Sequence, residues 1–261
     1  MMSTPENYRG QLVATRRAFV KQGLCLPLLV AGVAGAPFRA AAQAPSGATR
    51  EWPLKSAEGL KVNLVEAAAA RFKDRDAVAI ELTADAQKAL LVPGAAGNGP
   101  SFAMPEFEFA NGAIEVDVAA RINGKGQPEV RGFVGLAFHI ADDLRTFEAV
   151  YLRMTNGSRN VPPPPAPRSA FAVQYISFPD RYWRKLRQEH PNRYEKAAPV
   201  SIETWHKLRV EIAGSVARVF VDGEAVLTVD DVRFPDRKGR IGLWVDDGTT
   251  GYFANLKVTA R

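Results

Sequence analysis

The segment FEAVYLRMTNG, residues 147–157, combines the alternation of a β-strand with several long polar side chains. In a strand that runs to Thr155, Val150, Leu152 and Met154 would share one face, and the opposite face would carry Tyr151, Arg153 and Thr155. An aromatic ring can stack on the apolar C–H face of a sugar, and a guanidinium can donate hydrogen bonds to its hydroxyls. The segment therefore predicts either the floor of a sugar-binding site or a solvated outer face of a sheet.

Neighbouring segments carry side chains of the same kinds. In RGFVGLAFHI, Gly135, Ala137 and His139 lie on the face away from the core, and such small residues beside large polar ones would leave room for a ligand. Asn156 follows the opening strand, and polar or aromatic residues recur on the strands near residues 174 and 244. The sequence thus predicts a contact set for a glycan or small glycoside: Tyr151, Arg153, Asn156, Gln174, Trp183, Trp244 and Asp246.

The segment RYWRKLRQEHPNRYEK, residues 181–196, interleaves six basic residues with Trp183 and two tyrosines. Such a composition fits a site for single-stranded nucleic acid, a rim loop that clamps an acidic sugar, or an amphipathic helix. In the helical interpretation Trp183 and Leu186 pack inward, while Arg184 and Lys185 face solvent. The export signal described next argues against nucleic acid.

The first 44 residues have the pattern of a twin-arginine export signal. TRRAFVKQG places Arg16 and Arg17 before an apolar run, residues 24–38, and Ala42-Gln43-Ala44 fits a signal-peptidase site. The run is too short for a convincing membrane span. The leader carries five basic residues and one acidic residue, so its removal lowers the net charge from +6 to +2. We expect a periplasmic or secreted protein without the lone cysteine, Cys25.

Little in the sequence indicates a metal or a cofactor. His139, His190 and His206 lack metal-ligand spacing, and no nucleotide loop or nucleophile elbow is present. DDGTTG, residues 246–251, could hold a structural calcium ion, although a plain turn is the commoner role of such a segment. We therefore expect no cofactor, with structural calcium as the alternative.

Short alternating segments separated by glycine turns predict an all-β fold. Asn111-Gly112 and Asn123-Gly124 bracket one strand, and Asp222-Gly223 marks a hairpin. Only residues 84–91 and 181–191 look helical, and VPPPPAP, residues 161–167, is a stiff loop. The pattern predicts an antiparallel sandwich over residues 61–261, preceded by an arm or edge strand over residues 45–60.

The order of NGAIEVDVAAR, GLAFHI, VYLRMTNG, VQYIS, WHKLRVEI, ARVFVDGE and GRIGLWVDDGTTGYFANLKV resembles the concanavalin A-like lectin/glucanase superfamily. Within it the chain is most similar to 3-keto-disaccharide hydrolase (glycosidase-like) domains. The resemblance implies a jelly-roll sandwich of two curved antiparallel sheets whose concave face receives glycan. It also implies that Trp244 and Asp246 point into that groove.

The related β-glucanases carry an E-x-D-x-x-E strand that supplies their catalytic carboxylates. Here Glu115 and Asp117 fit its start, but Ala119 and Ala120 stand where the last glutamate belongs. Retaining hydrolysis needs a pair of carboxyl groups, so glucanase chemistry is not expected on this strand. We interpret Glu115 and Asp117 as an outward polar face.

A 3-keto-glycoside has an acidified C–H beside its carbonyl, so one general base and one group that stabilises an enolate would suffice. The candidate catalytic residues are His139 or Glu148 as the base and Arg153 as the oxyanion partner. Three functions remain open: a non-catalytic glycan-binding protein, a periplasmic 3-keto-glycoside hydrolase or lyase, and a structural adaptor domain of the envelope.

Overall fold

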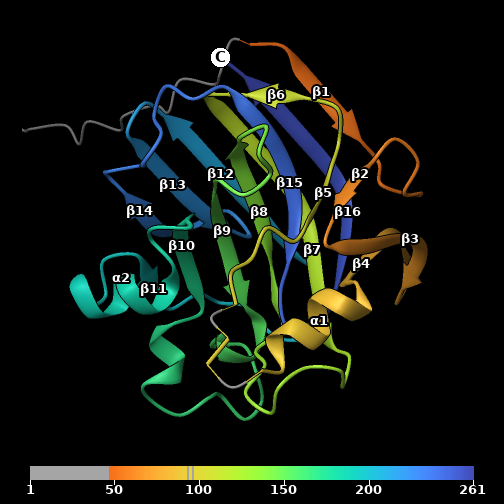
Figure 1. Cartoon of the computed structure of the whole chain (residues 1–261). Coiled ribbons are helices and arrows are strands. Elements are labelled where there is room, and N and C mark those ends of the chain that lie inside the picture. The colour runs from red at the N-terminus through yellow and green to blue at the C-terminus, as the bar shows by residue number, and fades with distance from the viewer. Residues whose placement is uncertain (1–46, 93, 96) are drawn as a thin grey trace, which may run out of the picture. The chain divides into compact units, whose positions relative to one another are not determined.

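The computed structural model describes residues 47–92, 94–95 and 97–261, so the predicted leader lies outside the described residues. Two antiparallel sheets of eight strands each pack face to face (Figure 1), which confirms the predicted all-β sandwich. Sheet A runs in the order β14 (Glu224–Val229), β13 (Val216–Val221), β12 (His206–Ala213), β7 (Gly112–Ile122), β16 (Thr249–Ala260), β4 (Arg75–Leu82) and β3 (Val65–Phe72), with β1 (Thr49–Trp52) paired to β16.

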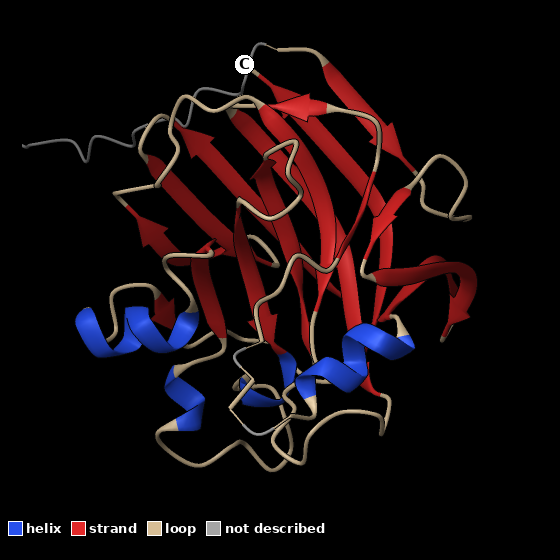
Figure 2. Ribbon diagram, in the orientation of Figure 1, coloured by secondary structure: helices blue, strands red, loops and turns tan. Residues whose placement is uncertain are grey.

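Sheet B contains most of the segment FEAVYLRMTNG, as strand β9. Its order is β11 (Glu195–Lys196), β10 (Val173–Phe178), β9 (Phe147–Arg153), β8 (Phe133–Ile140), β15 (Gly239–Val245), β5 (Phe102–Met104) and β2 (Lys61–Asn63), with β6 (Glu108–Phe109) paired to β15. The helical segments are α1 (Ala84–Leu90), α2 (Trp183–Glu189) and the 3-10 turns η1 (Met154–Asn156) and η2 (Arg168–Ala170). Figure 2 shows that they gather toward one end of the strands.

The core lies between the inner faces of the two sheets. Val150 and Leu152 of β9 and Val116 and Val118 of β7 are fully buried there, at alternate positions of their strands. Paired residues of antiparallel strands face the same side, so the pairing of Tyr151 with Gly135 and Gln174 places these three on the outer face of sheet B. The predicted separation of an apolar face from a polar one on β9 is therefore confirmed.

A β-bulge interrupts this alternation on β8. Between Ala137 and Ile140 the strand has one residue more than its partner β15, and His139 takes a left-handed φ of 51°. A bulge re-aims a side chain relative to the strand pattern. His139 consequently contacts Glu148 of the core face instead of joining Gly135 and Ala137 on the outer face.

Two further differences from the sequence predictions concern the end of strand β9 and the hairpin β3–β4. The strand predicted to run through Thr155 ends at Arg153, and the chain turns through η1, where the Asn160 side-chain amide donates to Met154 O at 2.8 Å. The hairpin β3–β4 was not predicted, because the alanine-rich run of β3 lacks a clear polar–apolar alternation. Within the described part of the chain, no helix has the length and apolarity needed to cross a membrane.

Candidate functional site

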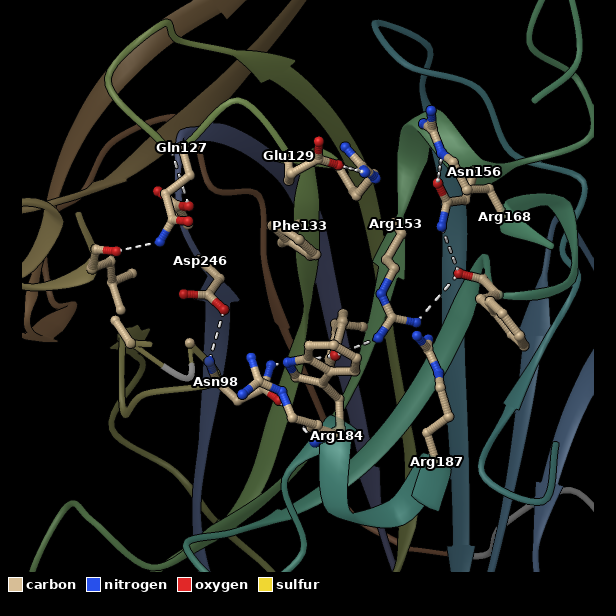
Figure 3. Close-up of a pocket in the computed structure, with 18 of the residues that line it drawn as sticks. Asn98, Gln127, Glu129, Phe133, Arg153, Asn156, Arg168, Arg184, Arg187 and Asp246 are labelled. Atoms are coloured by element: carbon tan, nitrogen blue, oxygen red, sulfur yellow. Dashed lines mark hydrogen bonds and ion pairs between the residues drawn. The ribbon is translucent and has the colours of Figure 1, made fainter. Parts of the chain in front are cut away.

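A cavity of about 410 Å³ lies at one end of the outer face of sheet B, and residues of the helical segments form part of its wall. Its walls come from α1, the loop before β5, the loop before β8, the ends of β8 and β9, η1, η2, α2 and the turn after β15. Figure 3 shows side chains from these elements converging on one space. The volume is within the roughly 300–1,000 Å³ of small-molecule sites.

Arg153 is held in place at the end of β9 by neighbours from three strands. Its guanidinium donates to Tyr151 Oη at 3.0 Å and to Gln174 Oε1 at 3.1 Å, and it lies 3.5 Å from a Glu195 carboxylate oxygen. Gln174 in turn donates to the Tyr194 carbonyl at 3.2 Å. Arg153 lines the cavity, whereas Gln174 lies beneath it and positions Arg153.

The space above Gly135 is filled by protein. A Cβ atom on Gly135 would lie 2.5 Å from Tyr151 Cα, so only glycine permits this close approach. Tyr151 and Trp244 pack ring against ring here, with centroids 4.8 Å apart, and Trp244 Nε1 donates to Gly99 O at 3.0 Å. Trp244 is fully buried and does not line the cavity, so the prediction that it contacts a ligand directly is contradicted.

Tyr151 contributes to the cavity wall although its side chain is fully buried. The hydroxyl oxygen accepts from Arg153 and, at 3.3 Å, from Asn98 Nδ2. Burial raises the pKa of Tyr151, so the phenol stays protonated near neutral pH. Both of these neighbours are donors, so among the described residues the Tyr151 O–H has no hydrogen-bond acceptor.

Asn98 joins three of the predicted residues and was missed by the sequence analysis. It is buried with a left-handed φ of 61°. Its backbone N–H donates to Asp246 Oδ2 at 2.8 Å, its Oδ1 accepts from the Trp183 backbone N–H at 3.1 Å, and its Nδ2 reaches Tyr151. Asparagine tolerates this backbone region, so the pair Asn98-Gly99 was the available signal.

Asp246 forms the acidic side of the cavity, as Figure 3 shows. Burial raises the pKa of Asp246 to about 6. The backbone N–H donors of Asn98 and Asp247 act in the opposite direction and lower it, but burial has the larger effect. Asp247 accepts from Gln87 Nε2 at 2.6 Å and from the Gln127 backbone N–H at 3.3 Å. These contacts bind the turn to protein donors, and among the described residues no cluster of three His, Cys, Asp or Glu could hold a metal ion.

The opposite wall carries aromatic rings and arginines. Asn156 Nδ2 donates to Phe171 O at 3.0 Å, and Asn156 Oδ1 accepts from Arg168 Nε at 3.2 Å. The Arg187 guanidinium lies 4.2 Å from the ring centre of Phe171 and 4.8 Å from that of Trp183. Phe133, Phe171 and Trp183 are half-buried, so parts of their rings are accessible from the cavity.

His139 and Glu148 lie on the other side of the sheet, fully buried in the core. His139 Nδ1 is 2.6 Å from Glu148 Oε2, and Nε2 is 2.8 Å from the Ala110 carbonyl. Glu148 also accepts from the Tyr175 hydroxyl and, at 2.7 Å, from the Arg233 backbone N–H. Their predicted role as a catalytic base is contradicted, because the bulge and the strand register turn both groups away from the cavity.

Glu115 and Asp117 are on β7 of sheet A, remote from the cavity walls. Asp117 pairs with Arg75 at 2.8 Å and with Lys207 at 3.0 Å, and Lys207 also reaches Glu115 at 3.3 Å. These ion pairs satisfy both carboxylates on the outer face of sheet A, in agreement with their interpretation as an outward polar face.

Five of the seven predicted contact residues line the cavity: Tyr151, Arg153, Asn156, Trp183 and Asp246. The cavity wall also contains residues that the sequence patterns did not indicate: Asn98, Gln127, Phe133, Arg168, Phe171 and Arg187. Most of these lie in loops or turns, where strand alternation gives no information. Phe133 and Arg187 lay within segments already singled out, but nothing in the alternation marked them.

No family model matches this chain, and a search of curated proteins finds no match. Among solved structures, a carbohydrate-binding module from Bacillus subtilis, CBM66, is similar over 77% of this chain and 96% of its own, with 15% identity and a TM-score of 0.50. A β-glucanase from Bacillus licheniformis covers 83% and 100% (13% identity, TM-score 0.47). A Bacillus subtilis protein of unknown function with a galectin-like fold covers 82% and 98% (14%, 0.48). The fold is the concanavalin A-like sandwich.

Proposed function

We propose that this protein binds a glycan or glycoside in the cavity at the end of sheet B. One observation carries the proposal: half-buried aromatic rings and fixed polar groups line the same cavity. Trp183 and Phe133 offer apolar surface for the C–H face of a pyranose, while Arg153, Asn156 and Asp246 can bond hydroxyls. The fold shared with a carbohydrate-binding module adds support.

A glycan array followed by titration calorimetry tests this proposal. Trp183→Ala should weaken binding of the selected sugar about tenfold or more, because an aromatic face is lost from the wall. Trp205→Ala removes a half-buried tryptophan that packs on Phe72 and is not part of the cavity wall, and should leave the affinity unchanged. Absence of binding across the array would refute the proposal and favour a structural adaptor of the envelope.

A second candidate is a 3-keto-glycoside hydrolase or lyase, favoured by the raised pKa of Asp246. A carboxyl group with a pKa of about 6 can take up a proton near neutral pH. In this mechanism Asp246 removes the proton beside the sugar carbonyl and Arg153 stabilises the enolate. A C=C bond then forms as the C–O bond to the glycosidic oxygen breaks, and that oxygen leaves with the proton that Asp246 returns to it. Hydrolysis then requires addition of water to the unsaturated product.

The second candidate is tested by incubating the protein with 3-keto-glucosides and following product by mass spectrometry. Asp246→Asn should abolish turnover while retaining sugar binding. Asp74→Asn, on the exposed turn between β3 and β4, removes a carboxylate that is not part of the cavity wall and should keep the rate of the parent protein. If no product forms with the parent protein, the binding function stands alone.

We also propose that the protein acts outside the cytoplasm, in the periplasm or after secretion. The support is the arrangement of Arg16, Arg17, the apolar run and Ala42-Gln43-Ala44 in the sequence. Extracytoplasmic glycans would then be its ligands.

A further inference from the structure

The charges that line the cavity are divided between two sides. Figure 3 shows Arg153, Arg168 and Arg187 on one side and Asp246 and Gln127 on the other. In all, five arginines and three carboxylates line the cavity. Positive charge therefore exceeds negative charge, and it is concentrated on one wall.

Two of these arginines share a single carboxylate. Glu195, itself buried, accepts from Arg187 Nε at 2.7 Å and from Arg187 Nη2 at 2.6 Å, in a bidentate pair. Arg153 is nearly as buried and reaches the same carboxylate only at 3.5 Å. A guanidinium remains charged in proteins, so one positive charge on this wall is not neutralised by Glu195.

Arg168 and Arg184 add to this excess. Arg168 donates to Asn156 Oδ1 and, at 3.2 Å, to Thr155 Oγ1, which are neutral acceptors. Arg184 is exposed and lies 5.4 Å from the centre of the Trp183 ring. Among the described residues neither guanidinium has an ion-pair partner. Burial and the neighbouring Arg131 lower the pKa of Arg168, so an anion placed beside it would be stabilised.

We propose that the ligand of this cavity is an anionic sugar, whose carboxylate or sulfate lies against Arg153, Arg168 and Arg187. This inference rests on the proposed function and names its ligand class. Guanidinium forks bind planar carboxylates and sulfate oxygens through charge-assisted hydrogen bonds. The Tyr151 hydroxyl can donate to the same group, and on the far side Asp246 can accept from sugar hydroxyls.

Calorimetric titrations with matched trisaccharides test the ligand class. The probes are oligogalacturonate and oligoglucuronate, their neutral galactose and glucose counterparts, and a sulfated galactose oligomer. At least one anionic probe should bind about tenfold or more tighter than its neutral counterpart, and high salt should reduce that ratio. Comparison of the carboxylated and sulfated probes identifies the anionic group.

Arg168→Gln should reduce the preference for the anionic probe over its neutral counterpart about fivefold or more, because one guanidinium is lost from the cavity wall. Arg184→Gln, on the exposed side of α2, is a second variant that should reduce the preference less. Arg218→Gln makes the same charge change at an exposed position of β13 in sheet A. It is the matched control and should leave the preference unchanged.

Equal binding of neutral and anionic probes, or an unchanged preference in both cavity variants, would overturn the anionic ligand while leaving glycan binding intact. If no sugar of either class binds, the proposed function itself fails and this inference fails with it.

Discussion

Two buried carboxyl groups, Glu148 of β9 and Asp246 in the turn after β15, show how position decides the role of a residue. Glu148 accepts from His139, Tyr175 and a backbone N–H, and no solvent reaches it. Removing one partner from such a buried cluster costs about 3–5 kcal/mol, so its role is structural. Asp246 instead lines the cavity with a raised pKa. The residue type alone could not distinguish the structural role of Glu148 from the position of Asp246 in the cavity wall.

Asp246 should make the folded state less stable as the pH rises. Its pKa is about 6 in the folded protein and has a reference value of 3.8, so the folded state binds the proton more tightly. The stabilisation it gives is complete below about pH 4 and is lost as the pH rises through about 6, a change of up to ~3 kcal/mol. Asp246→Asn lacks this dependence.

Urea unfolding at several pH values measures the effect. The free energy of unfolding of Asp246→Asn, relative to the parent protein, should increase between about pH 4 and 7 and then stay level. Asp74→Asn, on the exposed turn between β3 and β4, is the control. A difference that stays constant over the whole pH range would contradict the assignment.

At the scale of elements, loops, turns and a β-bulge determined which side chains reach the cavity more than the regular strands did. The bulge at His139 turned the His139 side chain from the outer face of sheet B to its core face. Strand β9 ended two residues earlier than predicted, because the chain enters the 3-10 turn η1. The loop before β5 contributes Asn98, which connects the turn after β15, strand β9 and helix α2. One loop residue therefore connects three of the elements that form the cavity wall.

Asn98→Gly should destabilise the protein and weaken sugar binding. Glycine keeps the left-handed backbone but removes the side-chain bonds to Tyr151 and to the Trp183 N–H. At about 1 kcal/mol for each hydrogen bond, the variant should lose roughly 2 kcal/mol of unfolding free energy.

Asn192→Gly is the matched control, because Asn192 has the same φ of 61° but is exposed. Denaturant unfolding of both variants isolates the side-chain contribution of Asn98. If the two variants lose equal stability, the proposed connecting role is wrong.

At the scale of the molecule, the two sheets have separate surfaces. On the outer face of sheet A, Lys207 forms ion pairs with Glu115 and Asp117, whereas the outer face of sheet B carries the cavity. The described residues begin at residue 47, and their first strand, β1, begins at Thr49. Cleavage after Ala44 would therefore leave every described strand intact.

Expression in a bacterium with a working twin-arginine pathway tests export. The mature protein should appear in the periplasm or medium with Pro45 as its first residue, as read by mass spectrometry. Arg16→Lys combined with Arg17→Lys should retain the precursor in the cytoplasm, because the proposed export signal depends on this arginine pair. Lys55→Arg is a neutral control, and a periplasmic double variant would contradict the prediction.

The sequence by itself determined the sandwich, most strand positions and the outward face of β9, because alternation and glycine turns are local signals that the register then preserved. It also identified Tyr151, Arg153, Asn156, Trp183 and Asp246, which the structure brings to one cavity. The tertiary structure alone decided that Trp244 is covered, that His139 and Glu148 are in the core, and that Asn98 and Arg168 join the wall. Those outcomes depend on a bulge and on contacts between segments far apart in the chain, which no local pattern encodes.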